Sequence, residues 1–328
     1  MFYQPNSVLI TGGAGFIGAN FIRYVLKNES CVSIVNLDKL TYAGSLQNLD
    51  SLSETNRYHF IKGDIRDEKL VENTLQFFNI DTIVHFAAES HVDRSINQPH
   101  NFIETNIIGT FILLEASRKY NLKRFHHIST DEVYGSLKND GSLFTENNSY
   151  RPRSPYSASK ASADHLVNCY FHTYNLPITI SNCSNNYGPY QHREKFIPKI
   201  IYSCLNKQPI PVYGNGKNIR DWLHVEDHCQ AIMTVIKKGK VGENYNIGGN
   251  NEWENIKLAH YICSQMDELF PWERNYASLI SHVTDRPGHD FRYAIDSTKM
   301  QTELVWAPKI NFAGGIRETI QFYFNKKF

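Results

Sequence analysis

Short apolar segments alternate with longer amphipathic segments over the first half of the chain. The apolar segments predict strands at Val8–Thr11, Val32–Asp38, Tyr58–Lys62, Thr82–Ala87, Phe125–Ser129 and Ile178–Asn182. The amphipathic segments predict helices at Ala19–Lys27, Glu68–Phe78, Asn101–Lys119 and Tyr156–Tyr174. This alternation favours right-handed βαβ units. We therefore predict a Rossmann-type, doubly wound α/β fold whose parallel sheet is covered on both faces.

The alternation ends near residue 185, where prolines and glycines become frequent. A few helices remain predicted there, for example at Val225–Lys237 and Gly314–Phe324. We expect an NAD-binding Rossmann domain over residues 1–184 and a smaller, loop-rich substrate lobe over residues 185–328. Some segments of the second part can return to the Rossmann domain. In such sheets ligands bind beyond the carboxyl ends of the strands.

Composition limits the classes of partner. The 328 residues carry a formal net charge of +1, which gives no reason to expect a nucleic-acid or membrane partner. No apolar run approaches the roughly 20 residues that span a bilayer. The start, Met1–Asn6, lacks the basic and apolar regions of a signal peptide. Six irregularly spaced cysteines without a CxxC pair predict buried free thiols and a cytoplasmic location.

Two histidines four residues apart, His224 and His228, raise the question of zinc. The zinc-protease pattern needs glutamate directly after the first histidine, and Val225 stands there. We expect no metal site.

A glycine-rich turn joins the first strand to the first helix. Gly12, Gly15 and Gly18 permit a tight turn and close approach of the backbone to a diphosphate. The free N–H groups at the helix start favour the phosphates. Asp38 ends the second strand, where a carboxylate accepts from ribose hydroxyls and repels a 2′-phosphate. The pattern predicts NAD rather than NADP.

A second group of residues carries candidate chemistry. Tyr156 and Lys160 are four apart on a predicted helix and face the same side. A nearby ammonium and a positive nicotinamide favour the phenolate, so Tyr156 can act as a base on a sugar hydroxyl. Thr130 follows the fifth strand, and the adjacent Asp131 and Glu132 add an acid and a base for a second step, the elimination of water.

Several motifs resemble known enzymes. The glycine turn and the Tyr156/Lys160 pair resemble the extended short-chain dehydrogenase/reductase family. Within it, the closer resemblance is to the dTDP-glucose 4,6-dehydratases, and it extends from about Val8 to Asp296. The motifs that carry it are Ala87–Ile96, Ser129–Gly135, Asn185–Gln191, Arg220–Trp222 and Arg286–Asp290.

The resemblance implies dehydration of a dTDP-glucose-like sugar to a 4-keto-6-deoxy sugar, with NAD regenerated. Tyr156 would deprotonate the C4 hydroxyl, which Thr130 binds. Glu132 would remove the C5 proton and Asp131 would protonate the departing C6 hydroxyl. Hydride would pass from C4 to NAD and back to C6.

The resemblance also implies the binding residues. Those expected at NAD are Gly12, Gly15, Phe16, Ile17, Gly18, Asp38, Lys39, Leu40, Thr41, Asp64, Ile65, Phe86, Ala87, Ala88, Ser90, Thr105, Tyr156, Lys160 and Asn186. Those expected at the nucleotide sugar are Ser90, Thr130, Asn185, Glu194, Lys195, Phe196, Pro211, Tyr213, Arg220, Asn255, Arg286 and His289. The two arginines would bind the diphosphate, and Tyr213 would stack on the base.

Three positions depart from the family pattern, which commonly has leucine at Phe196, proline at Arg193 and tyrosine at His224. The first two would lie beside the base, so the choice between thymine and uracil stays open. A UDP-glucose 4,6-dehydratase, a related 4-epimerase or decarboxylase, and a non-catalytic dinucleotide sensor are the alternatives. Epimerases and decarboxylases lack the complete acidic pair. The GDP-mannose dehydratases have serine at the position of Asp131, which makes Asp131 the discriminating residue.

The family also pairs two long helices across a homodimer, in a four-helix interface. The corresponding helices, Asn101–Lys119 and Tyr156–Tyr174, have more apolar residues than one core needs. These residues are Phe102, Ile107, Phe111, Leu114, Leu166, Tyr170 and Phe171. The resemblance implies a homodimer that serves deoxysugar synthesis for a polysaccharide.

Overall fold

The computed structural model describes residues 2–50, 52 and 55–326. Met1, the first residue of the segment assessed for a signal peptide, lies outside them. Across the described residues, seven parallel strands form the central sheet. In their order across it they are β10 (Asn244–Ile247), β6 (Ile178–Cys183), β5 (Arg124–Thr130), β4 (Thr82–His85), β1 (Ser7–Thr11), β2 (Ser33–Asp38) and β3 (Tyr58–Lys62). The Rossmann-type fold is confirmed.

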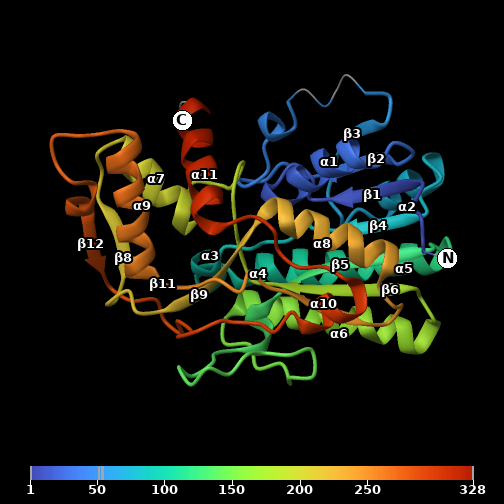
Figure 1. Ribbon diagram of the computed structural model, residues 1–328. Coiled ribbons are helices and arrows are strands. Elements are labelled where there is room, and N and C mark those ends of the chain that lie inside the picture. The colour runs from blue at the N-terminus through green and yellow to red at the C-terminus, as the bar shows by residue number, and fades with distance from the viewer. Residues whose placement is uncertain (1, 51, 53–54, 327–328) are drawn as a thin grey trace.

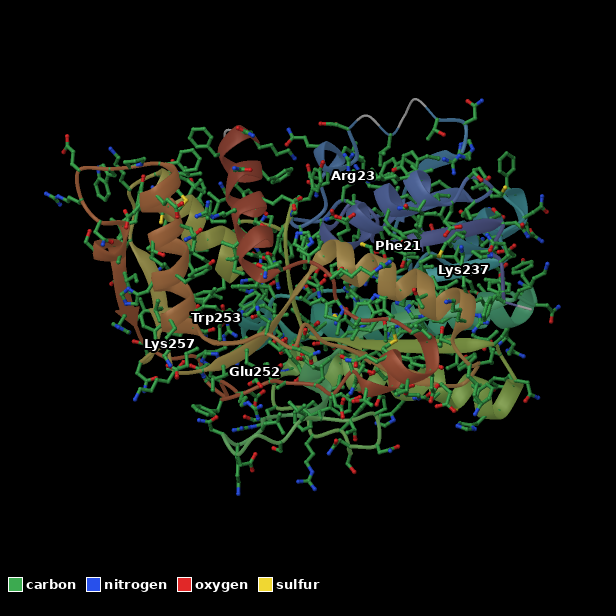
Figure 2. The ribbon with its side chains drawn as sticks, viewed as in Figure 1. Phe21, Arg23, Lys237, Glu252, Trp253 and Lys257 are labelled. Carbon is green, nitrogen blue, oxygen red and sulfur yellow. The ribbon has the colours of Figure 1, made fainter. Side chains whose placement is uncertain are left out.

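Helices cover both faces of this sheet (Figure 1). Those of the sheet layer are α1 (Phe16–Asn28), α2 (Glu68–Phe77), α3 (Val92–Asn97), α4 (Pro99–Phe102), α5 (Gly109–Lys119), α6 (Pro155–Tyr174), α8 (Val225–Lys238) and α10 (Thr298–Leu304). Alternate strand residues face opposite sides. Val8 packs with α1 and α8 in one core cluster, which includes Phe21 (Figure 2), and Leu9 packs with α2, α5 and α6 in another.

The remaining elements form a lobe at one end of the sheet (Figure 1). They are β7 (Asn185–Tyr187), α7 (Phe196–Leu205), β8 (Ile210–Tyr213), β9 (Ile219–His224), β11 (Glu252–Glu254), α9 (Asn255–Leu269), β12 (Ile280–Val283) and α11 (Phe312–Lys326). Trp253 (Figure 2) stacks on Phe312 in the core of this lobe. Since β10 and α8 belong to the sheet layer, the chain crosses between the two parts more than once. The division at residue 184 stays a prediction.

One long helix differs from expectation. The segment predicted as Asn101–Lys119 consists of α4, a π-helical segment Ile103–Ile108, and α5. The π segment contains Asn106, whose side chain accepts from Glu89 N at 2.8 Å and donates to Ser159 Oγ at 2.8 Å. Such bulges often re-aim a side chain at a functional site, and this one fixes the segment after β4 against α6.

The cysteines and the apolar helix faces also need correction. Cys31 and Cys169 are exposed, so the free thiols are not all buried. Phe102, Leu114 and Tyr170 are buried within the chain and are not available to a second subunit. Other apolar side chains of the same segments are exposed, namely Ile103, Ile108, Phe111 and Tyr174. Among the described helices, none has the length and apolar character needed to cross a bilayer.

Candidate active site

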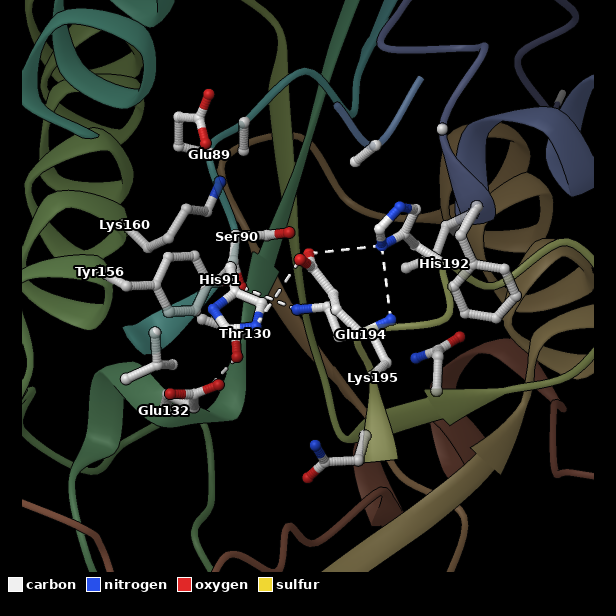
Figure 3. Close-up of a pocket in the computed structure, with 18 of the residues that line it drawn as sticks. Glu89, Ser90, His91, Thr130, Glu132, Tyr156, Lys160, His192, Glu194 and Lys195 are labelled. Atoms are coloured by element: carbon white, nitrogen blue, oxygen red, sulfur yellow. Dashed lines mark hydrogen bonds and ion pairs between the residues drawn. The ribbon is translucent and has the colours of Figure 1, made fainter. Parts of the chain in front are cut away.

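A single cavity of about 700 Å³ runs from the glycine turn to the small lobe. Among the described residues, it is lined by every residue predicted at the cofactor, the substrate or the reacting sugar, except Leu40. Figure 3 shows Tyr156 and Lys160 on one side of it, with Glu194 and Lys195 opposite. The sequence therefore predicted which side chains come together, and their individual roles stay predictions.

The glycine turn packs so closely against neighbouring backbone that two of its positions have no space for a side chain. Gly12 has φ +73°, and a Cβ there would lie 2.6 Å from Ala87 N. A Cβ on Gly18 would lie 2.4 Å from Gly12 O, so both positions require glycine. In the described chain no side chain caps the start of α1 at Gly15. Its first N–H groups are thus available to a diphosphate.

Asp38 is held at the end of β2 by two backbone donors. Its Oδ2 accepts from Ala14 N at 2.8 Å and its Oδ1 from Leu40 N at 2.7 Å. Burial raises the pKa of Asp38, and the two N–H groups oppose that rise. Leu40, which does not line the cavity in the described structure, acts here through its backbone. The glycine turn, the uncapped helix and this carboxylate together fit NAD.

Asp64 follows β3, where the adenine ring is expected. Lys39 lies 2.9 Å from its Oδ2 and Arg66 2.8 Å from the same atom. Burial raises the pKa of Asp64, but the hydrogen bonds from Arg66 and Lys39 outweigh it and hold that pKa well below its usual range. The carboxylate therefore stays charged and rigidly placed.

Thr130 ends β5 and starts a short 3-10 turn, Asp131–Tyr134. Its hydroxyl accepts from Glu132 N at 3.3 Å and donates to Asp131 Oδ1 at 3.4 Å. The other Asp131 carboxyl oxygen is buried without a hydrogen-bond partner among the described residues. Burial, followed by the charge of Glu132, raises the pKa of Asp131 well above its ordinary value. This carboxyl is suited to carry a proton at neutral pH.

Tyr156 and Lys160 project from α6 toward this turn. Burial and the Glu132 carboxylate raise the pKa of Tyr156, while a hydrogen bond with Thr130 lowers it. Lys160 Nζ donates to Ile128 O at 2.8 Å and contacts His127 Nε2 at 3.2 Å. Burial lowers the pKa of Lys160 to about 8. Lys160 is not among the main groups that shift the pKa of Tyr156, so the expectation that the ammonium and the nicotinamide together favour the phenolate stays a prediction.

Two arginines from the small lobe face the cavity. Arg220 is 7% exposed and donates to the carbonyls of Ile219 at 2.7 Å and Asp290 at 2.9 Å. Arg286 donates to Asp93 from Nε at 2.6 Å and from Nη2 at 3.1 Å. Both guanidinium groups are therefore fixed by backbone or carboxylate before any ligand arrives.

The other predicted substrate residues lie around these arginines. Lys195 Nζ donates to Ser90 O at 2.9 Å. The Phe196 ring stacks at 6.5 Å from Trp222. Asn255, the first residue of α9, has a buried Oδ1 without a partner among the described residues. An unpaired buried amide oxygen favours a ligand donor at this point.

Comparison with known proteins identifies the family. The family model described as GDP-mannose 4,6 dehydratase matches residues 9–319. The dTDP-glucose 4,6-dehydratase of Salmonella typhimurium is 51% identical, over 96% of this chain and 92% of its own. The chain belongs to the dTDP-glucose 4,6-dehydratase family. A member from Streptomyces venezuelae, solved with NAD, has a TM-score of 0.93 and 42% identity, and the match covers 98% of each chain.

Epimerases share the fold of this dehydratase family at lower identity. The UDP-glucuronic acid 4-epimerase of Bacillus cereus is 28% identical with a TM-score of 0.89, covering 98% of this chain and 99% of its own. The fold alone thus does not separate dehydratases from epimerases. The identity of about one half to named dehydratases, together with the Asp131–Glu132 pair, does.

Asp93 and Cys183 line the dehydratase-type cavity but were missed in the sequence. Asp93 accepts from Arg286 and, at 3.2 Å, from Tyr213 Oη, so it orders two predicted substrate residues. Asp93 lies inside the Ala87–Ile96 motif, and that position could have identified it as a candidate site residue. Cys183 ends β6 beside Thr130, and its sequence offers no such signal.

The departures from the family pattern have separate local explanations. Phe196 lines the cavity, whereas in the described structure Arg193 does not and lies 5.9 Å from the Tyr202 ring. His224 Nδ1 accepts from Glu226 N at 3.3 Å and so caps α8. Of these three departures, Phe196 is therefore the one that lines the cavity in the described structure.

Proposed function

We propose that the protein is an NAD-dependent hydro-lyase that converts dTDP-glucose into dTDP-4-keto-6-deoxyglucose. The observation that carries this proposal is the Thr130–Asp131–Glu132 turn, which meets Tyr156 in a cavity that begins at the glycine turn. Membership of the dTDP-glucose 4,6-dehydratase family supports the substrate. NAD bound at the glycine turn would accept hydride from C4 of the sugar and return it to C6.

Tyr156 removes the proton from the C4 hydroxyl. Burial and the charge of Glu132 raise the pKa of Tyr156, so a phenolate needs a nearby positive charge. Lys160 and the positive nicotinamide would supply it. Coupling proton removal to cofactor binding in this way keeps Tyr156 unreactive until the site is complete.

Water is then lost from C5 and C6. Oxidation at C4 acidifies the C5 proton, which Glu132 takes. Burial raises the pKa of Glu132, but the charges of Arg220 and Lys195 oppose this rise. Asp131 has the stronger reason to be protonated, since burial and the Glu132 charge both raise its pKa. We therefore assign the base to Glu132 and the acid to Asp131.

For the site to return to its starting state after one turnover, one proton must move from Tyr156 back to Asp131. Tyr156 gains the C4 hydroxyl proton, and Asp131 loses a proton to the departing hydroxide. Glu132 takes the C5 proton and gives it back to C5, so it needs no reset. The Thr130 hydroxyl lies between the other two, hydrogen-bonded to each. We assign it the return of the proton from Tyr156 to Asp131 after the product is formed.

The nucleotide part of the substrate occupies the small-lobe end of the cavity. Arg220 and Arg286 bind the diphosphate through guanidinium N–H groups that match phosphate oxygens. Tyr213 stacks on the base, and Phe196 packs beside it. Asn255 Oδ1 accepts a hydrogen bond from the ligand side. A preference for thymine over uracil would rest on burial of one methyl group, which contributes about 1 kcal/mol.

We also propose a homodimer built on α5, α6 and their neighbours. The exposed apolar side chains that would support it are Ile103, Ile108, Phe111 and Tyr174. Sedimentation of the purified protein tests it, and a monomer at micromolar concentration would contradict it. A cytoplasmic role in deoxysugar synthesis follows from a nucleotide-sugar substrate.

The decisive test is a product assay with a panel of dTDP-, UDP- and GDP-sugars. Incubation with dTDP-glucose should give a product lighter by one water, found by mass spectrometry, together with an alkali-labile 4-ketone. Faster turnover of UDP-glucose would reassign the base specificity. Recovery of only the galactose epimer would replace the dehydratase by an epimerase, and absence of any sugar oxidation would favour a dinucleotide sensor.

A further inference from the structure

A wholly buried polar pair lies behind Lys160. His127 of β5 and Asp164 of α6 are both 0% exposed. His127 Nε2 is 3.2 Å from Lys160 Nζ and 3.3 Å from Asp164 Oδ1. Among the described residues that line the cavity, neither of the two appears. They reach the cavity through Lys160 and Ser129, which both line it.

The spacing on α6 explains why the carboxylate is there. Tyr156, Lys160 and Asp164 recur every four residues, which places them along one face of the helix. Tyr156 and Lys160 face the cavity, and Asp164 lies one turn deeper against the sheet. Burying a carboxylate without hydrogen-bond partners would destabilise the fold. The partners of Asp164 therefore indicate that the structure holds this carboxylate in a defined position.

Asp164 is fixed through one of its oxygens. Oδ2 accepts from Ser129 Oγ at 2.7 Å, from Tyr150 Oη at 3.0 Å and from Asn182 Nδ2 at 3.4 Å. Oδ1 has His127 Nε2 as its neighbour at 3.3 Å. Three donors thus anchor the carboxylate and direct its second oxygen toward the imidazole.

The imidazole nitrogen lies between an ammonium and a carboxylate. A neutral ring has either a proton or a lone pair at Nε2. With the lone pair it accepts from Lys160. With the proton it carries its N–H beside Asp164 Oδ1, a buried oxygen that has no hydrogen-bond partner among the described residues. The position of one proton on His127 is therefore linked to whether Lys160 is charged. His127 Nδ1 has no partner in the described structure, so nothing there fixes the tautomer.

We infer that His127 and Asp164 are positioning residues for the proposed reaction: the imidazole holds the Lys160 amine from behind, and the Asp164 charge keeps that amine protonated. The inference rests on the proposed function, because it gives Lys160 a charge to supply to Tyr156. An opposite charge this close favours the ammonium, against the desolvation that disfavours it. In agreement, burial lowers the pKa of Lys160 and Asp164 opposes that shift.

The other titratable groups near this cluster lie on four elements. They are His85 on β4, His126 on β5, Cys183 on β6 and Tyr156 on α6, with Tyr150 in the segment before α6. Burial lowers the pKa of His85 well below its ordinary value and raises the pKa of Cys183. Both are therefore neutral near neutral pH. Burial raises the pKa of Asp164, and the charge of Lys160 together with the hydrogen bonds from its three donors opposes that rise. Asp164 is thus the carboxylate that balances Lys160.

The test is the reactivity of Lys160 toward acetic anhydride as a function of pH, read by peptide mass spectrometry. This measurement needs neither substrate nor NAD. In Asp164→Asn the pH of half-maximal labelling should fall by about one unit, because the free amine forms earlier. With NAD and dTDP-glucose, the alkaline limb of the single-turnover oxidation rate should move down by a similar amount.

Tyr150→Phe is the matched control. It removes a donor to Asp164 but retains the charge, so it should lower the melting temperature slightly and leave both pH midpoints in place. If Asp164→Asn does not fold, His127→Phe takes its place and should also lower the labelling midpoint, since the ammonium loses its acceptor.

An unchanged labelling midpoint in a folded Asp164→Asn or His127→Phe protein would reduce the pair to a structural role and overturn the inference. Failure of the wild-type protein to dehydrate dTDP-glucose would instead overturn the proposed function. The labelling result would stand in that case, so the two failures are distinguishable.

Discussion

Asp131 and Glu132 are consecutive residues of one short turn, and their carboxyl groups differ in the charges around them: the Glu132 charge adds to the rise in the pKa of Asp131, whereas Arg220 and Lys195 oppose the rise in that of Glu132. Asp131 is 2% exposed, and one of its oxygens has no hydrogen-bond partner in the described chain. Glu132 lines the cavity where the positive charge of Arg220 opposes the effect of burial on its pKa. A proton on Asp131 and a charge on Glu132 are the arrangement that an elimination requires.

Asp131→Asn should uncouple oxidation from elimination. The asparagine retains the shape of the side chain but cannot protonate the leaving hydroxyl, so the rate of water loss should fall by roughly 10²–10⁴-fold. Tyr156 and NAD are unaltered, so C4 oxidation continues. Stopped-flow absorbance of the reduced nicotinamide should therefore show a transient accumulation that the wild-type protein does not show.

Tyr156→Phe provides the comparison for that experiment, because it removes the first proton acceptor and should give no reduced nicotinamide. Glu132→Gln should resemble Asp131→Asn, since it also blocks only the second step. If Asp131→Asn lost NAD reduction as completely as Tyr156→Phe, the separation of roles between oxidation and elimination would be wrong.

The raised pKa of Asp131 also predicts a pH dependence of stability. Between the unfolded and the folded pKa of Asp131 the folded state binds the extra proton, so the contribution of Asp131 to the free energy of unfolding falls as pH rises. Each unit of the rise costs about 1.4 kcal/mol once the pH exceeds the folded value. Asp131→Asn should flatten this slope and be the more stable protein at pH 8, measured by urea unfolding. A slope equal to that of the wild type would contradict a raised pKa.

Six strands of the described seven-stranded sheet could be predicted because their signals are local, whereas β10 was not predicted. Each βαβ unit consists of a continuous apolar segment followed by an amphipathic helix. The glycine turn indicates at which end of the sheet the ligand binds. Thr130 is the last residue of β5, so the strand pattern itself places the turn that carries the proposed catalytic residues. The small lobe has no such signal, since β7 and β11 are three-residue strands whose partners are chosen by distant contacts.

The same distinction applies to the site. Tyr156 and Lys160 are one helical turn apart and could be paired from spacing. Arg286 meets Asp93 across 193 residues of sequence, and periodicity cannot predict that contact. His127 is 33 residues from Lys160, and the strand pattern of β5 gives no indication of that contact. Resemblance to a family supplied candidate residues, and the three-dimensional structure was needed to find their partners.

Asp38 predicts the choice of dinucleotide. Asp38→Ala should raise the Kd for NAD by about 10–100-fold, since hydrogen bonds to a charged group contribute roughly 1.5–3 kcal/mol. The Kd for NADP should rise less, because the substitution removes the repulsion of the 2′-phosphate. Calorimetric titration of both cofactors tests this. Asp67→Ala, which alters the cap of α2, is the matched control and should leave both values unchanged. An equal rise of the Kd for NAD and for NADP would show that Asp38 does not discriminate between the ribose hydroxyl and the 2′-phosphate.

Arg286 predicts a defect confined to the nucleotide sugar. Its guanidinium binds Asp93 through two N–H groups and lies 5.1 Å from the centre of the Tyr213 ring. A lysine cannot make this two-point contact and still reach a phosphate. Arg286→Lys should raise KM for dTDP-glucose about tenfold or more and leave the Kd for NAD unchanged. Arg317→Lys, in a surface ion pair with Glu268, is the matched control and should alter neither value. Weaker NAD binding in Arg286→Lys would place this arginine at the cofactor instead of the sugar diphosphate.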